Sequence, residues 1–169
     1  TYQINYTYRL HGQQYGSPVA LYRRLRAQQP VSFGALIALP AVDSDDQHWV
    51  LSCSPELFLQ HEKGALLARP MKGTAARDAD PLLDAANAQW LAQDAKNRAE
   101  NVMIVDLLRN DLGRIATVGS VQVPHLFTVE PYATVHQMTS TVVAQLATGV
   151  RFPQVLRALF PCGSITGAP

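Results

Sequence analysis

The chain has 169 residues, of which 47% are hydrophobic and 16% are charged, and its formal net charge is +1. This composition is typical of a globular domain and excludes a disordered chain. The small net charge gives no support for a general affinity for nucleic acid or acidic membranes. No apolar run reaches the roughly 18 residues of a membrane-spanning helix. Cys53 and Cys162 have neither metal-ligand spacing nor a disulfide framework, so we expect reduced thiols in a cytoplasmic protein.

The first part of the chain predicts mainly strands. Residues 2–10 alternate strictly between aromatic or aliphatic and polar side chains, which predicts a strand. Ser17 followed by Pro18 is typical of a helix N-cap and first turn, and we expect that helix to run to about Gln28. Further strands are expected at 31–39 and 48–53, followed by a hairpin of 56–62 and 65–70 that turns at Lys63-Gly64. The stretch ARPMKGTAAR, residues 68–77, is interpreted as a short, basic, turn-prone loop.

The second part begins with two helices, expected at 79–94 and 96–112, with Gly113 as the C-terminal stop. Alternation of β-branched residues then predicts strands within 118–130 and 132–147. A short helix at 153–160 precedes a Gly-rich loop that extends to the last residue. Because strands and helices are mixed without a regular β–α–β order, we expect an α+β fold.

Lys72 lies between Arg69 and Arg77. A free lysine amine has a pKa near about 10.4 and is almost wholly charged at neutral pH, whereas a nucleophilic amine must be neutral. Lowering the pKa by about three units needs roughly 4 kcal/mol, which one like charge about 4 Å away could supply before screening. An anion-binding loop or a surface lysine would use the same residues, so composition leaves these alternatives open.

Carboxylates at three places in the sequence complete the candidates. Glu56 follows Ser54-Pro55 at a strand end and is either a turn residue capped by Ser54 or a general acid beside a cleft. Glu100, near the start of a predicted helix, could be a single Mg²⁺ ligand. Later in that helix we expect a buried structural network, formed by Asp106, Arg109, Asn110 and Asp111.

These segments, in chain order, resemble those of the chorismate-utilising enzymes, which include the anthranilate, isochorismate, salicylate and aminodeoxychorismate synthases. The matching stretches cover nearly the whole chain: YQIN, SPELFL, RPMKGTAAR, KNRAENVMIVDLLRNDLGR, VQVPHLFTVEPYATVHQMTS and PCGSITGAP. The resemblance implies that the α+β fold is part of this family's fold, in which packed antiparallel β-sheets are flanked by helices.

Within the family, alanine at the position of Lys72 is typical of the anthranilate, isochorismate and salicylate synthases, and lysine is typical of the aminodeoxychorismate synthases. The resemblance therefore implies amination of chorismate at C4 to 4-amino-4-deoxychorismate, for para-aminobenzoate and folate synthesis. It implies that Lys72 adds covalently at C2 and that Glu56, as general acid, protonates the C4 hydroxyl that leaves. Ammonia from a glutamine amidotransferase partner would then displace the lysine.

The resemblance also assigns the remaining site. Glu100 falls on a Mg²⁺ ligand position, with the metal bridging to the ring carboxylate of the substrate. The implied substrate-binding residues are Thr74, Gln137, Ser164, Gly167 and Ala168. The family often has a second acid where this chain has Asn97, which weakens the local negative charge. Its common histidine maps to Gln137, while His136 comes one position earlier, and neighbours on a strand face opposite sides, so only one of the two can line the site.

The ends of the chain lead us to expect a piece cut from a longer polypeptide, because no initiator methionine is present and the chain stops in a Gly-rich segment. The family pattern continues in both directions and supplies further Mg²⁺ and substrate ligands. We therefore interpret residues 1–169 as a partial chorismate-binding domain with little or no turnover by itself. Two alternatives stay open: an activity like that of anthranilate synthase, and a non-catalytic piece that binds an anionic metabolite or a partner.

Overall fold

The computed structural model describes residues 6–41 and 47–166. The chain divides into two compact units, a smaller one of Thr7–Leu57 and a larger one that contains Phe58–Pro169. Each unit is described by itself. Among the described residues, none of the helices combines the length and the apolar character that crossing a bilayer requires.

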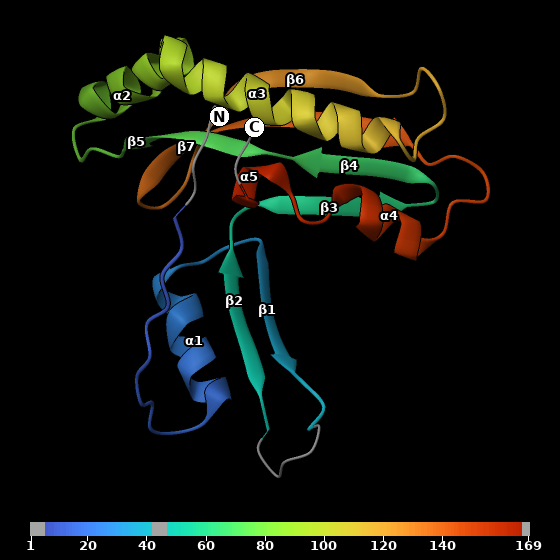
Figure 1. Ribbon diagram of the computed structural model, residues 1–169. Coiled ribbons are helices and arrows are strands. Elements are labelled where there is room, and N and C mark those ends of the chain that lie inside the picture. The colour runs from blue at the N-terminus through green and yellow to red at the C-terminus, as the bar shows by residue number, and fades with distance from the viewer. Residues whose placement is uncertain (1–5, 42–46, 167–169) are drawn as a thin grey trace. The chain divides into compact units, whose positions relative to one another are not determined.

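The smaller unit contains one helix and a two-stranded antiparallel sheet (Figure 1). Helix α1 spans Pro18–Gln28, and its predicted N-cap is confirmed, because the Ser17 side chain accepts a hydrogen bond from the backbone N–H of Ala20. Strands β1 (Phe33–Ala38) and β2 (Trp49–Ser54) pair along their full length. The two strands predicted here are therefore confirmed, with small shifts at their ends.

The first predicted strand is not found where the structure describes it. Residues 2–5 lie outside the described residues, and residues 6–10 have no strand conformation. The side chains of Tyr6, Tyr8 and Leu10, expected on one face of that strand, are exposed. Alternation alone does not make a strand, because a strand also needs a neighbouring strand to complete its backbone hydrogen bonds.

The larger unit is built on a five-stranded antiparallel sheet. Strand β7 (Val135–Gln145) is central, with β6 (Gln122–Pro131) on one edge and two shorter strands, β4 (Ala65–Arg69) and β5 (Met71–Ala76), in succession along the other. Strand β3 (Leu57–Glu62) pairs with β4. The predicted hairpin between them is confirmed, since Lys63 and Gly64 have the positive φ angles of a tight turn, +48° and +87°.

Two long helices cover one face of this sheet (Figure 1). Helix α2 (Pro81–Gln93) begins at the N-cap Asp80, and α3 (Ala95–Gly113) begins at the N-cap Asp94, whose side chain accepts from the Asn97 N–H at 2.8 Å. Both predicted helices are confirmed. Gly113 was predicted as the residue that stops the helix, but it is the last residue within α3 and does not have the positive φ angle of such a stop. Two short helices follow β7, namely α4 (Phe152–Leu159) and α5 (Gly163–Thr166).

The main core lies between the sheet and the helices. Its buried side chains come from β4, β7, α3 and α4, and include Leu66, Val142, Ile104, Leu108, Leu112 and Leu159. A smaller cluster joins Ala75, Leu91 and Met138. The residues of α3 that face inward recur every three or four positions, as expected for an amphipathic helix. Mixed helices and antiparallel sheets confirm the predicted α+β class.

Candidate active site

The segment that carries Lys72 is a strand with a bulge, so its interpretation as a loop is wrong. Met71 pairs with Thr139 and Thr74 pairs with Gln137, which places three steps of β5 opposite two steps of β7. Gly73 has a φ of +103°, a conformation that side chains with a Cβ rarely adopt. Glycine and small residues are common at turns and at bulges alike. What distinguishes the two is pairing with β7, which is remote in the sequence.

The amine of Lys72 contacts helix α5 of the larger unit. Its Nζ donates a hydrogen bond to the backbone oxygen of Ser164, at 3.3 Å. Ser164 is buried in α5, and its hydroxyl lies 3.1 Å from the Cys162 sulfur. The residues at 163–166, predicted as part of a Gly-rich loop, form one helical turn. The structure therefore brings together Lys72 on β5 and Ser164 on α5, two residues that the sequence analysis proposed separately as site residues.

The two arginines that flank Lys72 each have a carboxylate partner. Arg69 forms an ion pair with Glu130 on β6. The guanidinium of Arg77 donates to both carboxylate oxygens of Asp84, at 2.8 and 3.0 Å. Neither arginine therefore acts on Lys72 as an isolated positive charge, which reduces the like-charge effect proposed from the sequence.

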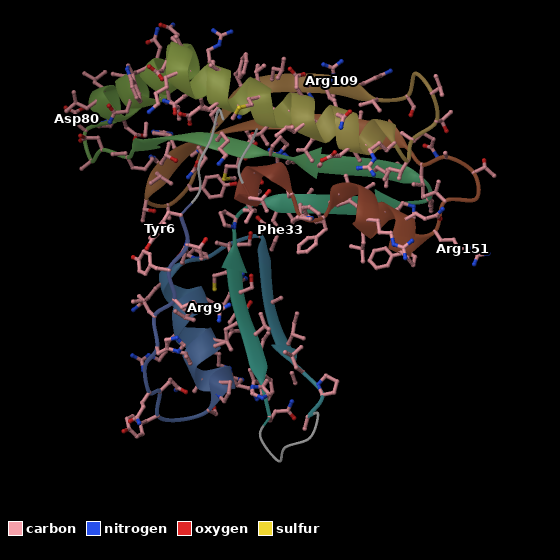
Figure 2. The ribbon with its side chains drawn as sticks, in the orientation of Figure 1. Tyr6, Arg9, Phe33, Asp80, Arg109 and Arg151 are labelled. Carbon is pink, nitrogen blue, oxygen red and sulfur yellow. The ribbon has the colours of Figure 1, made fainter. Side chains whose placement is uncertain are left out.

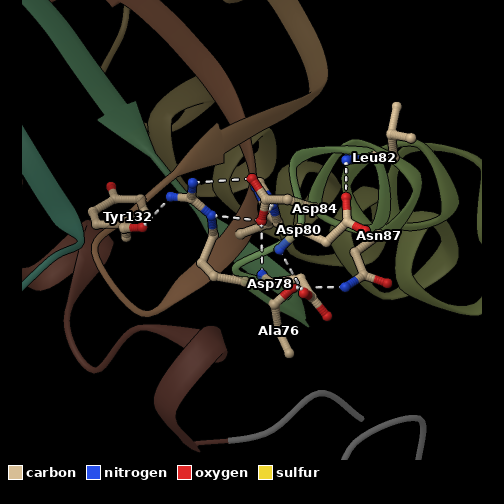
Figure 3. A network of polar contacts seen from close by, with 9 residues as sticks. Ala76, Asp78, Asp80, Leu82, Asp84, Asn87 and Tyr132 are labelled. Atoms are coloured by element: carbon tan, nitrogen blue, oxygen red, sulfur yellow. Dashed lines mark hydrogen bonds and ion pairs between the residues drawn. The ribbon is translucent and has the colours of Figure 1, made fainter.

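Asp84 is the centre of the polar network drawn in Figure 3. Besides the two bonds from Arg77, its Oδ1 accepts from the backbone N–H of Asp78 at 3.0 Å and lies 2.9 Å from Nε2 of His136. Arg77 also donates to the backbone oxygen of Tyr132 at 2.7 Å. The hydrogen bond from Arg77, followed by that from Asp78, holds the pKa of Asp84 well below its usual range. The network ties the start of α2 to β5 and β7.

Thr74 and Gln137 meet across the sheet. They are direct partners in the β5–β7 pairing, and the Thr74 hydroxyl donates to Oε1 of Gln137 at 3.0 Å. His136 contacts Asp84 of α2 instead. The prediction that these two neighbours face opposite sides of the strand is confirmed. Because Oε1 of Gln137 accepts from Thr74, the amide NH₂ of Gln137 points the other way and can donate to a ligand.

Glu100 lies on α3 with its side chain 45% exposed, and its Oε1 is 3.8 Å from Nζ of Lys96. Mg²⁺ typically takes one or two protein carboxylates together with water and substrate oxygens, so one half-exposed glutamate fits as a single ligand. Among the described residues, no three histidine, cysteine, aspartate or glutamate side chains gather to hold a metal ion. Asn97, one turn earlier, donates to its own N-cap Asp94 at 2.8 Å.

Three further residues were predicted for the site, namely Glu56, Gly167 and Ala168. Glu56 belongs to the smaller unit, between β2 and β3, where its backbone N–H donates to the Ser54 hydroxyl at 3.3 Å. Capping of this turn by Ser54, one of the two interpretations, is thus present. Gly167 and Ala168 lie outside the described residues.

The network predicted at the end of α3 is not buried. Asp106 and Arg109 do form the expected ion pair, at 2.9 Å, but their side chains are 59% and 54% exposed. Figure 2 shows Arg109 on the outer side of α3. Asn110 is also exposed, and its amide lies 3.4 Å from a carboxylate oxygen of Asp111. Asp106 interrupts an apolar run because the helix turns it away from the face that carries Val105 and Leu108.

Asn101 is the residue that sequence reasoning missed. It is completely buried on α3 and contacts the backbone of Lys72 through its side-chain amide. A signal was available, since Asn101 occupies the same helical stripe as Ile104 and Leu108, and a polar residue on a core stripe must have internal partners.

Comparison with known proteins places the chain in a family. All of residues 1–169 match the model of the chorismate binding enzyme family. Aminodeoxychorismate synthase component 1 of Klebsiella aerogenes is 48% identical over 168 residues, which are 99% of this chain and 36% of that protein. Anthranilate synthase component 1 of Neisseria meningitidis serogroup B is 40% identical over 153 residues, 90% of this chain and 30% of that protein.

Among solved structures, anthranilate synthase component I from Streptococcus pneumoniae TIGR4 matches with a TM-score of 0.76 and 32% identity, covering 92% of this chain and 32% of that one. The chain thus spans about a third of the length of these relatives. The match to the family model over the whole chain, together with these identities, shows that the chain belongs to the chorismate binding enzymes.

Proposed function

We propose that the protein aminates chorismate at C4, forming 4-amino-4-deoxychorismate on the route to para-aminobenzoate and folate, with Lys72 as covalent nucleophile. The observation that carries the proposal is the position of the Lys72 amine, which donates a partly buried hydrogen bond to the backbone oxygen of Ser164 on α5. Support also comes from relatives that are 45–48% identical and are named aminodeoxychorismate synthase component 1.

The proposed reaction consists of two displacements. The neutral amine of Lys72 forms a bond to C2 and loses a proton, the ring double bonds shift, and the C4–O bond breaks. Glu56 donates the proton with which the hydroxyl leaves as water. Ammonia then bonds to C4, the double bonds shift back, and the C2–N bond breaks. The proton that the new C4 nitrogen loses passes to the departing nitrogen, which restores the neutral amine of Lys72. The sum is chorismate plus ammonia giving the amino product plus water.

Several residues would orient the substrate. The NH₂ of Gln137, whose Oε1 accepts from Thr74, can donate to a substrate oxygen. As the family resemblance implies, the Ser164 hydroxyl would bind a substrate carboxylate. A bound Mg²⁺, with Glu100 as one ligand, would neutralise the ring carboxylate of chorismate. We also propose that ammonia comes from a glutamine amidotransferase, since relatives named component 1 imply a second component.

The test is product analysis with the full polypeptide that carries these residues, supplied with chorismate, ammonium and Mg²⁺. Lys72→Ala should remove or divert amination at C4, and Glu56→Gln should lower kcat by about 10²–10⁴-fold, as expected for loss of a general acid. In an acid-quenched reaction, the peptide that contains Lys72 should gain the mass of chorismate minus water. Lys63→Asn, at the β3–β4 turn, is the matched control and should keep activity and adduct.

Unchanged 4-amino-4-deoxychorismate formation by Lys72→Ala would contradict the nucleophile assignment. Formation of anthranilate by the unaltered protein would favour the activity of the second group of relatives, such as the Neisseria meningitidis protein. For the 169-residue chain alone we expect little turnover, and calorimetry with chorismate, with and without Mg²⁺, distinguishes a partial site from a piece that does not bind the substrate.

A further inference from the structure

We infer that Asn101 is a positioning residue for the reaction: its side-chain amide fixes the β5 bulge and thereby the position of the Lys72 amine relative to α3. This inference rests on the proposed function for its catalytic consequence. Asn101 and all the residues that it contacts belong to the larger unit. Asn101 does not itself touch the reacting atoms.

The contacts of Asn101 converge on the bulge. Its Nδ2 donates to the backbone oxygen of Lys72 and to that of Met138, both at 3.3 Å, and its Oδ1 accepts from the Ser140 hydroxyl at 2.5 Å. The side chain is 0% exposed, so these contacts are shielded from water. The single amide therefore joins α3 to β5 and to β7 at the point where the two strands lose their regular pairing.

The register explains why a side chain is needed there. Between the pairs Met71–Thr139 and Thr74–Gln137, two residues of β5 stand opposite the single residue Met138 of β7. A bulge disrupts the ladder locally and leaves backbone groups to be satisfied in another way. The two carbonyls that accept from Asn101 are those of Lys72 and Met138, one on each side of the disruption. The helix thus supplies the donors that the ladder does not.

The same amide is held from its other end. The Ser140 hydroxyl that donates to Oδ1 of Asn101 also accepts from the backbone N–H of Phe127, at 3.2 Å. Phe127 has a φ of +59° in a second irregularity, in β6, and Arg98 of α3 stacks on its ring at 4.5 Å. Asn101 is therefore part of a buried chain of hydrogen bonds that crosses three strands, which restricts its rotation.

The consequence for chemistry follows from the neighbours of Asn101. It directly follows Glu100, the proposed Mg²⁺ ligand, and it contacts the backbone of Lys72, the proposed nucleophile. One buried side chain therefore sets the spacing between the metal ligand and the nucleophile. A displacement of about 1 Å at a reacting group can lower the rate by roughly 100-fold.

The experiment uses the full polypeptide that carries these residues and two readouts. The first is the split between kcat and KM for chorismate. The second is acylation of Lys72 by an amine-selective reagent, measured by peptide mass spectrometry relative to Lys96, whose side chain is 83% exposed. Asn101→Asp keeps the shape and both acceptor positions but removes the donors, and Ser140→Ala keeps the donors but removes the bond to Oδ1.

We expect Asn101→Asp to lower kcat by roughly 100-fold, with KM within a few-fold, and to raise Lys72 acylation relative to Lys96. Ser140→Ala should also lower kcat and raise Lys72 acylation, but each by less than Asn101→Asp does. If circular dichroism shows that Asn101→Asp does not fold, the positioning role is tested with Ser140→Ala, by kcat and KM and by Lys72 acylation. Wild-type kcat and wild-type acylation in a folded variant would overturn the inference, as would a fall in kcat with unchanged acylation.

Failure of the proposed function gives a different result. In that case Lys72→Ala keeps C4 amination, while the Asn101 and Ser140 variants still change Lys72 acylation. A different pair of results would refute the positioning role alone. In that case Lys72→Ala loses activity, while Asn101→Asp shows raised Lys72 acylation but keeps the wild-type kcat.

Discussion

Replacing Gly73 with alanine is expected to destabilise the larger unit by about 2 to 6 kcal/mol, the sum of two separate costs. The first is conformational: a φ of +103° is unfavourable for a residue with a Cβ, by about 1–3 kcal/mol. The second is crowding. A Cβ on Gly73 would lie 3.1 Å from Cβ of Asn97 and 3.2 Å from both Oδ1 of Asn97 and Cβ of Met138. Overpacking of this kind typically costs about 1–3 kcal/mol.

Two other glycines separate these costs. Gly119 has a φ of +79° but nothing within 4 Å of its would-be Cβ, so Gly119→Ala should show only the conformational cost of about 1–3 kcal/mol. Gly113 is helical and also has nothing within 4 Å, so Gly113→Ala should stabilise by about 0.4–1 kcal/mol. The three variants share one chemical change and differ only in backbone conformation and surroundings.

The assay is urea unfolding of the 169-residue chain in a Trp49→Phe background. Fluorescence of Trp90 on α2 then reports the larger unit, because the chain has only two tryptophans and Trp49 is in the smaller unit. If Gly73→Ala is no less stable than Gly119→Ala, close approach of α3 to the bulge is not a constraint. If Gly119→Ala has no effect either, the conformational argument is also wrong.

Three further substitutions test the core, the caps and the polar network. Leu112→Ala removes a fully buried side chain of α3 and should lower the free energy of unfolding by about 2–5 kcal/mol. Val118→Ala, at a fully exposed position, should change it by no more than about 0.5 kcal/mol. Equal effects of the two substitutions in urea unfolding would contradict the core assignment. Ser17→Ala should cost about 1 kcal/mol of α1 stability, seen as reduced helical circular dichroism on heating, and Ser17→Gly should cost less. Because the folded pKa of Asp84 is lowered, its contribution is complete above about pH 4 and is lost as pH falls toward that folded pKa. Asp84→Asn should therefore lower the urea midpoint at about pH 6 and lower it less at about pH 3; an equal difference at both would show that the carboxylate charge is not responsible.

The elements that sequence predicted well have local causes. Ser17, Asp80 and Asp94 are side chains that accept backbone N–H groups two or three residues ahead, so the start of each helix is specified within one turn. The turn at Lys63-Gly64 likewise depends on two adjacent residues. The opposite orientation of His136 and Gln137 follows from strand geometry alone.

The site was only partly predictable because its contacts are remote in sequence. Lys72 and Ser164 are 92 positions apart, and Thr74 and Gln137 are 63 apart. No pattern in residues 68–77 shows that they pair with β7, and their small and basic residues are equally typical of a loop. In the same way, the periodicity of the sequence could not show that Arg69 forms an ion pair with Glu130 on β6.

By itself, the sequence determined where the helices begin, which helix faces are apolar, the mixed fold class, and which residue types carry the candidate chemistry. Only the tertiary structure decided that Lys72 lies on a bulged strand, that its amine contacts α5, and that Asn101 joins it to α3. Caps, turns and helical periodicity act over a few residues, whereas strand pairing and buried hydrogen bonds depend on segments that meet only when the core between the sheet and the helices has formed.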